Sequence, residues 1–263
     1  MLKQGPATIS IRLEGVSVRY RIPTEPVSTL KEYVIRLAHG KRAVYRDFWA
    51  LRSVSLEVLR GEALGIIGRN GAGKSTLLKV IARVLRPTAG RVWYQGQLAP
   101  LIELGAGFNP ELTGRENVYL NGAMLGFSRD DMMAKFDQIV EFAGLWDFID
   151  APLRTYSSGM VMRLGFAVAS DVEPDILIID EILAVGDESF RQKCLERMES
   201  YRESGTTILF VSHSLDSIRS TCSRAVWIED GRLRRDGSAD EVTAAYREYI
   251  AHNPQGDPRS RDT

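Results

Sequence analysis

The sequence lacks features that mark several large classes of protein. Only two of its 263 residues are cysteines, too few for a disulfide scaffold or a metal cluster. Its longest apolar runs, such as 63–67 and 176–179, fall far short of the roughly 20 residues that a membrane-spanning helix needs. The N-terminus has neither the basic start nor the apolar core of a secretory signal. We therefore expect reduced thiols, a cytoplasmic setting and no membrane crossing by this chain alone.

An excess of charge is also missing. The 34 basic residues balance the 34 acidic ones, and 44% of the residues are hydrophobic, which is typical of a folded globular protein. This balance argues against long nucleic-acid-binding arms. The length fits one large domain or two small ones.

The pattern of apolar residues changes along the chain. Residues 9–20 and 54–58 alternate between apolar and polar side chains, which predicts antiparallel strands with one solvated face. Residues 63–67, 176–179 and 207–211 are apolar without alternation, as expected of strands covered on both faces. Helical patterns fall between these strands, so a largely parallel sheet is predicted.

Helical spacing dominates residues 113–145, where one apolar stripe consists of Met132, Phe136, Ile139, Val140 and Ala143. Further helices are predicted from near Gly159 and over 190–202. Near the C-terminus, residues 224–228 and 233–235 flank Asp-Gly and predict a hairpin.

Residues 68–75, Gly-Arg-Asn-Gly-Ala-Gly-Lys-Ser, have the spacing of a phosphate-binding loop. Its glycines let backbone N–H groups converge on phosphate oxygens, Lys74 can reach the terminal phosphates, and the Ser75 hydroxyl can ligate Mg²⁺. The loop follows a buried strand and precedes a helix with Leu77, Ile81 and Val84 at helical spacing, the setting that this motif requires. The predicted nucleotide-binding residues here are Gly68, Asn70, Gly71, Gly73, Lys74, Ser75 and Thr76.

Two carboxylates, Asp180 and Glu181, end a later buried strand. With Mg²⁺ bound to a triphosphate, Asp180 would act through the water shell of the metal and Glu181 would orient or deprotonate the attacking water. His213 follows the next apolar strand and could contact the γ-phosphate, because open parallel sheets bind ligands at the carboxyl ends of their strands. A solvated strand end and a structural histidine are the alternatives, and the phosphate loop upstream favours the catalytic interpretation.

Tyr-Ser-Ser-Gly-Met, residues 156–160, lies directly before another apolar helix. Taken alone, a serine N-cap explains it most simply. As a set, however, these motifs and their order resemble the nucleotide-binding subunits of ABC transporters over nearly the whole chain. The resemblance implies an α/β fold: a P-loop NTPase ABC ATPase with a RecA-like mixed or parallel sheet core, an antiparallel β subdomain and an α-helical subdomain at about 109–170. The ATPase domain would span 1–250, with a polar tail at 251–263.

The resemblance also implies roles for residues outside the phosphate loop. Ser157, Ser158 and Gly159 would contact ATP bound to the opposite protomer, so that a homodimer encloses two ATP molecules. Tyr20 matches the aromatic residue that stacks on adenine, with Trp49 as its competitor. Asp187 matches the acid of the D-loop.

Three departures from the common pattern narrow the resemblance. The signature motif of the family, residues 156–160 here, is Tyr-Ser-Ser-Gly-Met and not the common Leu-Ser-Gly-Gly-Gln. The glutamine of the usual lid loop is missing from residues 101–108, where Glu103 is the nearest candidate for its metal and water contact. An insertion occupies about 22–48. Together with 109–117, these resemble ATPases that export O-antigen, teichoic acid or capsular polysaccharide. The implied partners are two integral membrane subunits and a lipid-linked glycan at the cytoplasmic face of a bacterial membrane, without nucleic acid.

The insertion predicts a short amphipathic helix. Thr29 can cap it with Glu32 as the reciprocal partner, and its apolar stripe consists of Leu30, Tyr33, Val34 and Leu37. Its basic neighbours, Arg36, Lys41, Arg42 and Arg46, suit anionic lipid headgroups or a lipid-linked pyrophosphate. Packing of this helix on its own domain is the alternative.

Other functions fit the sequence less well. A DNA-repair or chromosome-organising ATPase of this family would have a long coiled coil between its nucleotide motifs, and a translation-associated cassette protein would have two copies of the loop. A small-molecule kinase would not need the signature or Glu181. Some exporters of this branch carry a C-terminal β-sandwich, and the polar tail is equally consistent with an end and with a linker.

Overall fold

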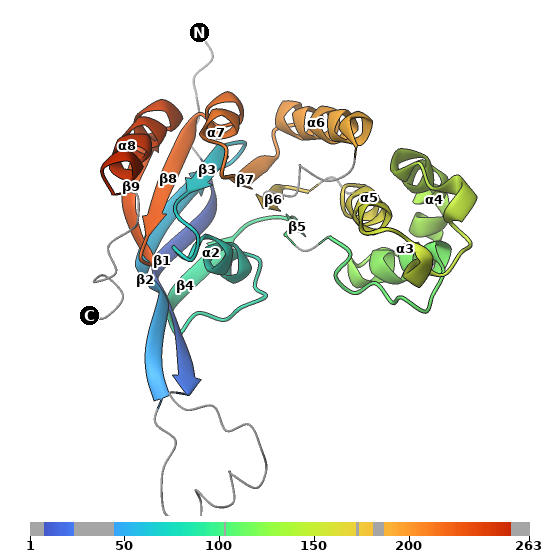
Figure 1. Cartoon of the computed structure of the whole chain (residues 1–263), viewed down its shortest axis with the longest axis horizontal. Coiled ribbons are helices and arrows are strands. Elements are labelled where there is room, and N and C mark those ends of the chain that lie inside the picture. Colours follow the sequence, from blue (N-terminus) through green and yellow to red (C-terminus); the bar gives the residue numbers. More distant parts are fainter. Residues whose placement is uncertain (1–7, 24–44, 103, 172–173, 181–186, 254–263) are drawn as a thin grey trace, which may run out of the picture.

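The computed structural model describes residues 8–23, 45–102, 104–171, 174–180 and 187–253. The strands there are β1 (Ile9–Pro23), β2 (Tyr45–Leu59), β3 (Ala63–Ile67), β4 (Ala89–Tyr94), β5 (Leu98–Leu101), β6 (Ile176–Asp180), β7 (Thr207–Val211), β8 (Arg224–Glu229) and β9 (Arg232–Ser238). The helices there are α2 (Lys74–Ile81), α3 (Gly114–Met124), α4 (Arg129–Ala143), α5 (Ser158–Ala169), α6 (Glu188–Glu203), α7 (Leu215–Thr221) and α8 (Ala239–His252). They form the two sheets and the helical group seen in Figure 1.

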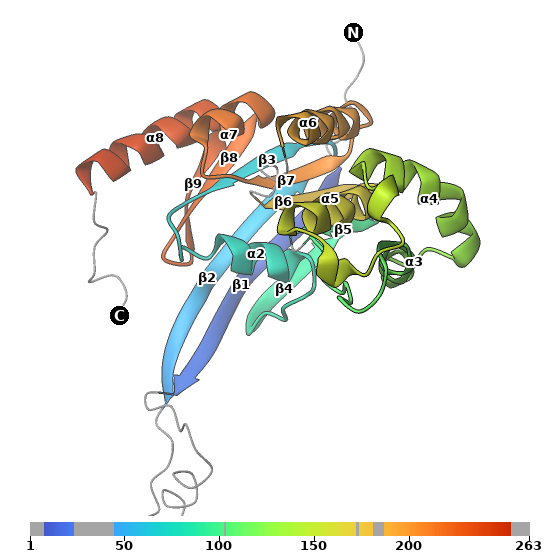
Figure 2. The same cartoon turned by 45° about the vertical axis from the view of Figure 1, so that its right-hand side comes forward.

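The first sheet is antiparallel, with the order β2-β1-β4. Alternate residues face the interior: Ile11 and Leu13 of β1 and Leu56 and Val58 of β2 are at most 4% exposed. The predicted period of two is therefore confirmed. At one end, β1 and β2 continue as a two-stranded ribbon that projects from the body of the molecule (Figures 1 and 2).

The second sheet has the order β5-β6-β7-β3-β8-β9 and is parallel except for the β8–β9 hairpin. One face packs against α2 and the antiparallel sheet, and the other packs against α6, α7 and α8. Burial on both faces accounts for the unbroken apolar runs of β3, β6 and β7. The predicted mixed core and C-terminal hairpin are confirmed, whereas β4 and β5 were not predicted.

One predicted position in the helix after the phosphate loop was wrong. Leu77 and Ile81 are fully buried, but Val84 is 68% exposed. The reason is that α2 ends at Ile81 and Arg83 has a left-handed backbone (φ +58°), which turns the chain before Val84 can join the apolar stripe.

The helical group consists of α3, α4 and α5 around a core of its own. Thr113 and Ser128 begin α3 and α4 with complete capping boxes, so each helix start is fixed by reciprocal hydrogen bonds. The predicted stripe of α4 is buried, from Met132 to Ala143. Figure 2 shows this group beside β5, the edge of the larger sheet that lies farthest from α8.

Three phenylalanines join the helical group to the body of the molecule. Phe142 of α4, Phe166 of α5 and Phe190 of α6 have ring centroids 5.6–6.0 Å apart, which is the range of favourable aromatic pairs. Within the helical group, Lys135 links α4 to the segment after α5, because its Nζ lies 2.8 Å from the buried carboxylate of Asp171 and 2.8 Å from its carbonyl.

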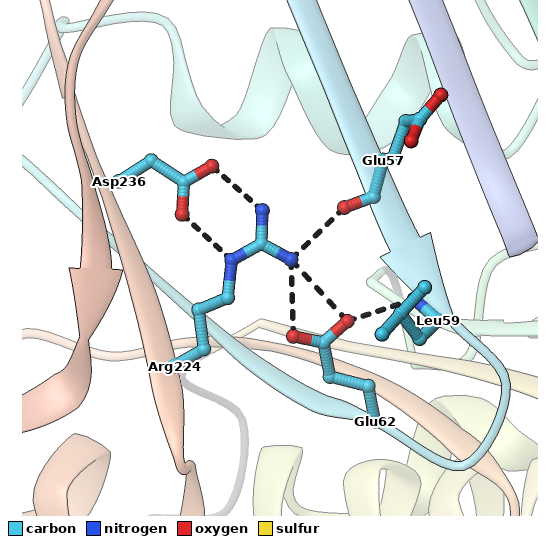
Figure 3. A network of polar contacts seen from close by, with 5 residues as sticks. All are labelled: Glu57, Leu59, Glu62, Arg224 and Asp236. Carbon is cyan, nitrogen blue, oxygen red and sulfur yellow. Dashed lines mark hydrogen bonds and ion pairs between the residues drawn. The ribbon is translucent and has the colours of Figure 1, made fainter. Parts of the chain in front are cut away.

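Arg224 at the start of β8 links both sheets (Figure 3). Its Nε and Nη2 donate to the two carboxylate oxygens of Asp236 on β9 at 2.6 Å, and Nη1 donates to Glu62 at 3.1 Å and to the carbonyl of Glu57 on β2 at 3.0 Å. Glu62 also accepts from the backbone N–H of Leu59. Hydrogen bonds to Asp236, followed by those to Glu62, raise the pKa of Arg224. This network joins β2, β8 and β9 at the edge of the molecule where β3 and β8 begin.

Helix α8 covers β8 and β9 and continues through His252, two residues into the segment 251–263 predicted as a tail. The rings of Tyr246 and Tyr249 lie 5.3 and 4.9 Å from that of Trp227. Among the helices of the described ranges, none combines the length and the hydrophobicity needed to span a bilayer.

Candidate nucleotide-binding site

The phosphate loop connects β3 to α2, and close packing fixes its backbone. A Cβ atom on Gly68 would lie 2.2 Å from the carbonyl oxygen of Ile228, and one on Gly73 would lie 2.5 Å from that of Ala50. Gly68 and Gly73 also have φ angles of +151° and +110°. Only glycine fits both requirements, so the loop backbone can turn tightly into the N-terminus of α2.

Lys74, the first residue of α2, is 6% exposed. Its Nζ donates to the carbonyls of Gly68 at 2.7 Å and Arg69 at 3.1 Å, so the ammonium group lies along the loop itself. Asn70, Gly71 and Ser75 are exposed and Thr76 is half-buried. Nothing lies within 4 Å of the position of a Cβ on Gly71, which leaves that side of the loop open. The N-terminus of α2 thus combines a positive helix end with a cation.

Strand register brings the predicted catalytic groups to the same sheet edge. Asp180 pairs with Val211 of β7, and Val211 pairs with Ile66 of β3. The phosphate loop begins two residues after Ile66, and His213 lies two residues after Val211. The carboxyl ends of β6, β7 and β3 therefore present Asp180, His213 and the phosphate loop side by side. Asp180 is half-buried and His213 is exposed.

The serine-glycine segment begins α5. The Ser157 side chain accepts from the backbone N–H of Met160 at 3.2 Å, which confirms the N-cap role. Ser158 is exposed, and a Cβ on Gly159 would have only the Ser157 hydroxyl as a neighbour, at 3.9 Å. The preceding Tyr156 is buried and donates from its hydroxyl to the carbonyl of Phe148 at 2.7 Å. The start of α5 is therefore held in place by Tyr156 and Ser157, and Ser158 and Gly159 face solvent.

Asp187 is the N-cap of α6, a role that sequence reasoning missed. Its carboxylate accepts from the Ser189 hydroxyl at 2.7 Å and from the Phe190 N–H at 2.9 Å. The hydrogen bond from Ser189, followed by that from Phe190, lowers the pKa of Asp187. The sequence signal for this role is an aspartate directly before the start of a helix.

The aromatic candidates for the adenine base lie on opposite faces of the ribbon. Tyr20 is 39% exposed and follows buried Val18 by two residues on β1, so both face the side of the sheet on which α2 packs. Phe48, which sequence reasoning missed, pairs directly with Tyr20 and is 42% exposed. Trp49 pairs with Arg19, whose guanidinium lies 5.5 Å from its ring centroid.

The motifs at this edge match one family. The sequence profile described as "ABC transporter" matches residues 51–184, from β2 past Asp180. The chain belongs to the ABC transporter family. An O-antigen export system ATP-binding protein RfbB of Klebsiella pneumoniae is 47% identical over 245 residues, covering 92% of this chain and 98% of that protein. The teichoic acids export ATP-binding protein TagH of Bacillus cereus is 41% identical, covering 92% of this chain and 43% of that protein.

Solved structures support the ABC ATPase fold. The dimeric post-hydrolysis structure of the cassette MJ0796 bound to ADP and Pi has a TM-score of 0.68 at 22% identity and covers 87% of this chain and 98% of that one. A structure of the ATP-binding subunit of an ABC transporter has a TM-score of 0.69 at 23% identity, covering 90% and 93%. The predicted fold class is thereby confirmed.

Some residues predicted for the ABC site lie outside the described part of the chain: Glu103, Glu181 and 24–44 of the insertion. The insertion predicted at about 22–48 begins and ends within described strands, because β1 extends to Pro23 and β2 begins at Tyr45. The ribbon therefore includes both ends of the range 22–48, since each residue from Tyr20 to Pro23 still pairs with a residue of β2.

Proposed function

We propose that this chain is the ATP-hydrolysing subunit of an ABC exporter that moves a lipid-linked polysaccharide of the O-antigen, teichoic acid or capsule type across the cytoplasmic membrane. The observation that carries the proposal is the register that places Asp180, His213 and the phosphate loop at one sheet edge. Similarity along 98% of an O-antigen export subunit supports the choice of transported substrate.

ATP would bind with its phosphates at the N-terminus of α2. The backbone N–H groups of the loop and the ammonium group of Lys74 would contact the phosphate oxygens. The Ser75 hydroxyl and the Asp180 carboxylate are oxygen donors that suit Mg²⁺, which keeps several waters and binds few protein groups when it also binds phosphate. When bound, the ion would neutralise phosphate charge. Glu103 is a further candidate ligand in this proposal.

Hydrolysis requires groups that act on the attacking water and on the γ-phosphate. Glu181 would orient or deprotonate the water, since it directly follows Asp180 at the end of β6. His213 would contact the γ-phosphate from the end of β7. The assignment of Glu181 rests on its place in the sequence directly after Asp180, and that of His213 on its place after β7, beside the strand that leads into the phosphate loop.

Each ATP would be enclosed by two copies of this chain. The exposed Ser158 and the open surface at Gly159 form the start of α5, and a helix N-terminus is suited to bind an anion. In the proposed homodimer, Ser157, Ser158 and Gly159 of one copy face the γ-phosphate held by the other, with Asp187 beside them in the interface. The dimeric cassette of the same fold is consistent with this arrangement.

Two integral membrane subunits would convert ATP-driven closure of the dimer into movement of the glycan. The chain would act at the cytoplasmic face of the membrane as a peripheral subunit. The basic insertion, at about 22–48, would lie near lipid headgroups and help to admit the lipid-linked substrate. The similarity to O-antigen and teichoic acid export ATP-binding proteins supports this substrate class.

Two substitutions test the shared site. Glu181→Gln should retain ATP and give a stable dimer on sizing chromatography, whereas a monomer that still hydrolyses ATP would contradict the proposal. Glu188→Gln is a matched control, because this carboxylate is 85% exposed. Ser158→Arg should abolish turnover and leave ATP binding intact, and loss of ATP binding would show that the signature acts within one copy.

The transported substrate is tested separately. Purification of the intact complex from membranes, followed by mass spectrometry, should identify an integral membrane subunit and a lipid-linked sugar. A complex that contains another substrate class would refute the export proposal. If deletion of residues 30–40 changed neither glycan export nor substrate-stimulated ATP hydrolysis, the proposed role of the insertion would be wrong.

A further inference from the structure

Tyr156, the first residue of the signature, has a hydroxyl that the leucine of the common signature lacks. The residue is buried, its hydroxyl donates to the carbonyl of Phe148 at 2.7 Å, and its N–H donates to the carbonyl of Leu153 at 3.0 Å. Burial, followed by the charge of Asp150, raises the pKa of Tyr156, so the hydroxyl remains a donor at neutral pH. The residue before the N-cap of α5 is therefore fixed through both its backbone and the far end of its side chain.

This hydroxyl fits only because residue 114 is glycine. A Cβ atom on Gly114 would lie 2.3 Å from the hydroxyl oxygen of Tyr156, far inside the contact distance of two such atoms, and 3.0 Å from the carbonyl oxygen of Ile149. Gly114 is the first residue of α3 and its φ is not left-handed, so alanine would strain no dihedral there and would favour the helix. The need for glycine at this position therefore comes from the space that the hydroxyl occupies.

Two chain segments, 110–115 and 149–154, hold Gly114 opposite Tyr156. They run antiparallel, with a bridge between Thr113 and Pro152. Backbone hydrogen bonds of 2.8–3.2 Å join them, from the N–H groups of Leu153, Arg154, Gly114 and Arg115 to the carbonyls of Leu112, Pro110, Ala151 and Ile149, respectively. The second segment leads directly into the signature, so its position determines where the signature begins.

Asn117 of α3 fixes the first of these segments from inside. Its side chain is fully buried, and its Oδ1 accepts from the N–H of Asn109 at 2.7 Å. Its Nδ2 lies 2.9–3.2 Å from the carbonyls of Asn109, Leu112 and Thr113. A buried amide with these partners holds the turn before α3 in one conformation. Gly114 is therefore a fixed surface against which the hydroxyl of Tyr156 rests.

We propose that Tyr156 is a positioning residue for ATP hydrolysis: its hydroxyl, seated between Gly114 and the carbonyl of Phe148, sets where the start of α5 meets ATP. This inference rests on the proposed function, because it takes Ser158 and Gly159 to contact the γ-phosphate held by the opposite copy. Tyr156 is buried, so it acts through the two residues that follow it and does not itself contact the nucleotide.

Tyr201 of α6 provides a matched control. It is 4% exposed, and its hydroxyl donates to the carbonyl of Ser170, the C-cap of α5. Tyr156→Phe and Tyr201→Phe therefore each remove one buried hydrogen bond to a carbonyl, at opposite ends of the same helix. Both variants should lower the midpoint of urea unfolding similarly. Only Tyr156→Phe should lower turnover.

The experiment measures ATP turnover, ATP affinity and urea unfolding of the full chain with each substitution. We expect kcat to fall about tenfold for Tyr156→Phe, because misplacement of groups that contact the reacting phosphate acts on chemistry. The Kd for ATP should stay within about twofold of wild type, since the phosphate loop is unchanged. Tyr201→Phe should stay within about twofold of wild type in both kcat and Kd. Equal kcat values for the two phenylalanine variants would overturn the inference.

A rescue experiment tests the contact with Gly114. Gly114→Ala should lower kcat in the wild-type background, because its Cβ displaces the hydroxyl of Tyr156. In the Tyr156→Leu background the hydroxyl is gone, so the same change should alter kcat by no more than about twofold. Equal fold losses from Gly114→Ala in both backgrounds would also overturn the inference.

The comparison of the two phenylalanine variants decides the question if Gly114→Ala does not fold. Wild-type turnover, measured in parallel, tests the proposed function itself. A wild-type chain without ATP turnover would refute the proposed function and this inference with it. A wild-type chain with normal turnover, together with equal losses in Tyr156→Phe and Tyr201→Phe, would refute only the role of Tyr156.

Discussion

Tyr20 on β1 and Phe48 on β2 are direct cross-strand partners, and both rings are exposed. A bulge beside this pair leaves Ala50 out of register: Val18 pairs with Leu51, but Arg19 pairs with Trp49. The phosphate loop packs on the same stretch, because a Cβ on Gly73 would meet Ala50 and Leu51. Tyr20 and Phe48 are therefore the first exposed aromatic pair along the ribbon from the phosphate loop, on the face toward α2.

This arrangement favours Tyr20 over Trp49 as the residue that stacks on adenine. Tyr20→Ala should weaken ATP binding about tenfold, since stacking of a base on an aromatic side chain contributes about 1–3 kcal/mol. Phe48→Ala should have a smaller effect in the same direction. The measurement is isothermal titration of the purified chain with ATP and with inorganic tripolyphosphate, whose affinity should not change.

Trp49→Ala is the control for that prediction, because its ring is half-buried and contacts Arg19 on the other face. Its affinity for ATP should stay within about twofold of wild type. Weaker ATP binding for Trp49→Ala together with unchanged binding for Tyr20→Ala would reverse the assignment.

The glycines of the phosphate loop should differ in their tolerance of alanine. Gly73→Ala combines a φ of +110° with a contact of 2.5 Å to backbone, so we expect a loss of at least about 2 kcal/mol in the free energy of unfolding. Gly71 has a φ of +78° but open space around its Cβ position, so Gly71→Ala should lose only about 1 kcal/mol. Urea unfolding without nucleotide measures both, and equal losses would refute the role of the Ala50 contact.

Much of the fold could be predicted from the sequence because its signals are local. β3, β6 and β7 are covered on both faces, and their apolar runs follow directly from that burial. β5 gave no such signal, because it is four residues long, contains Pro100 and, among the described strands, is an edge strand paired with β6. β4 contains Gly90 and is mostly exposed, so its strand character comes from pairing with β1.

The candidate site divides in the same way. The phosphate loop is one continuous run of residues, and so is the Asp180–Glu181 pair. The chemistry of their residues indicates a nucleotide-binding site. Phe48 depends on a distant partner, because a bulged register between β1 and β2 pairs it with Tyr20. Sequence periodicity predicts which face of a helix or strand is buried, but it does not predict which residues of two elements contact each other.

Arg224 should contribute more to stability than an exposed arginine with equally short contacts. Arg224→Ala would leave Glu62, only 11% exposed, without the guanidinium, and removal of one partner from a buried ion pair costs about 3 kcal/mol or more. Arg219→Ala removes a surface pair with Asp240, at 2.7 Å, which should cost less than about 1 kcal/mol. Chemical denaturation compares them, and similar losses would show that the network in Figure 3 adds no stability.

The two cysteines should make the protein less stable at alkaline pH. Burial raises the pKa of both Cys194 and Cys222 from 9.0 to about 12. Between these values the native state keeps two protons that the unfolded chain releases, so the free energy of unfolding falls as the pH rises. Each thiol should lower it by about 1.4 kcal/mol between pH 8 and pH 10.

The test compares the pH dependence of unfolding in wild type with that of Cys194→Ala and Cys222→Ala. Alanine leaves a small cavity and lowers stability at every pH, so the informative quantity is the difference between the values at pH 8 and pH 10. Each variant should show a difference smaller than that of wild type by about 1.4 kcal/mol, because one titrating thiol is gone. Unchanged differences would mean that the thiols ionise equally in the native and unfolded states. In that case a thiol reagent should also modify the native protein at pH 8, whereas protected, neutral thiols should react only after unfolding.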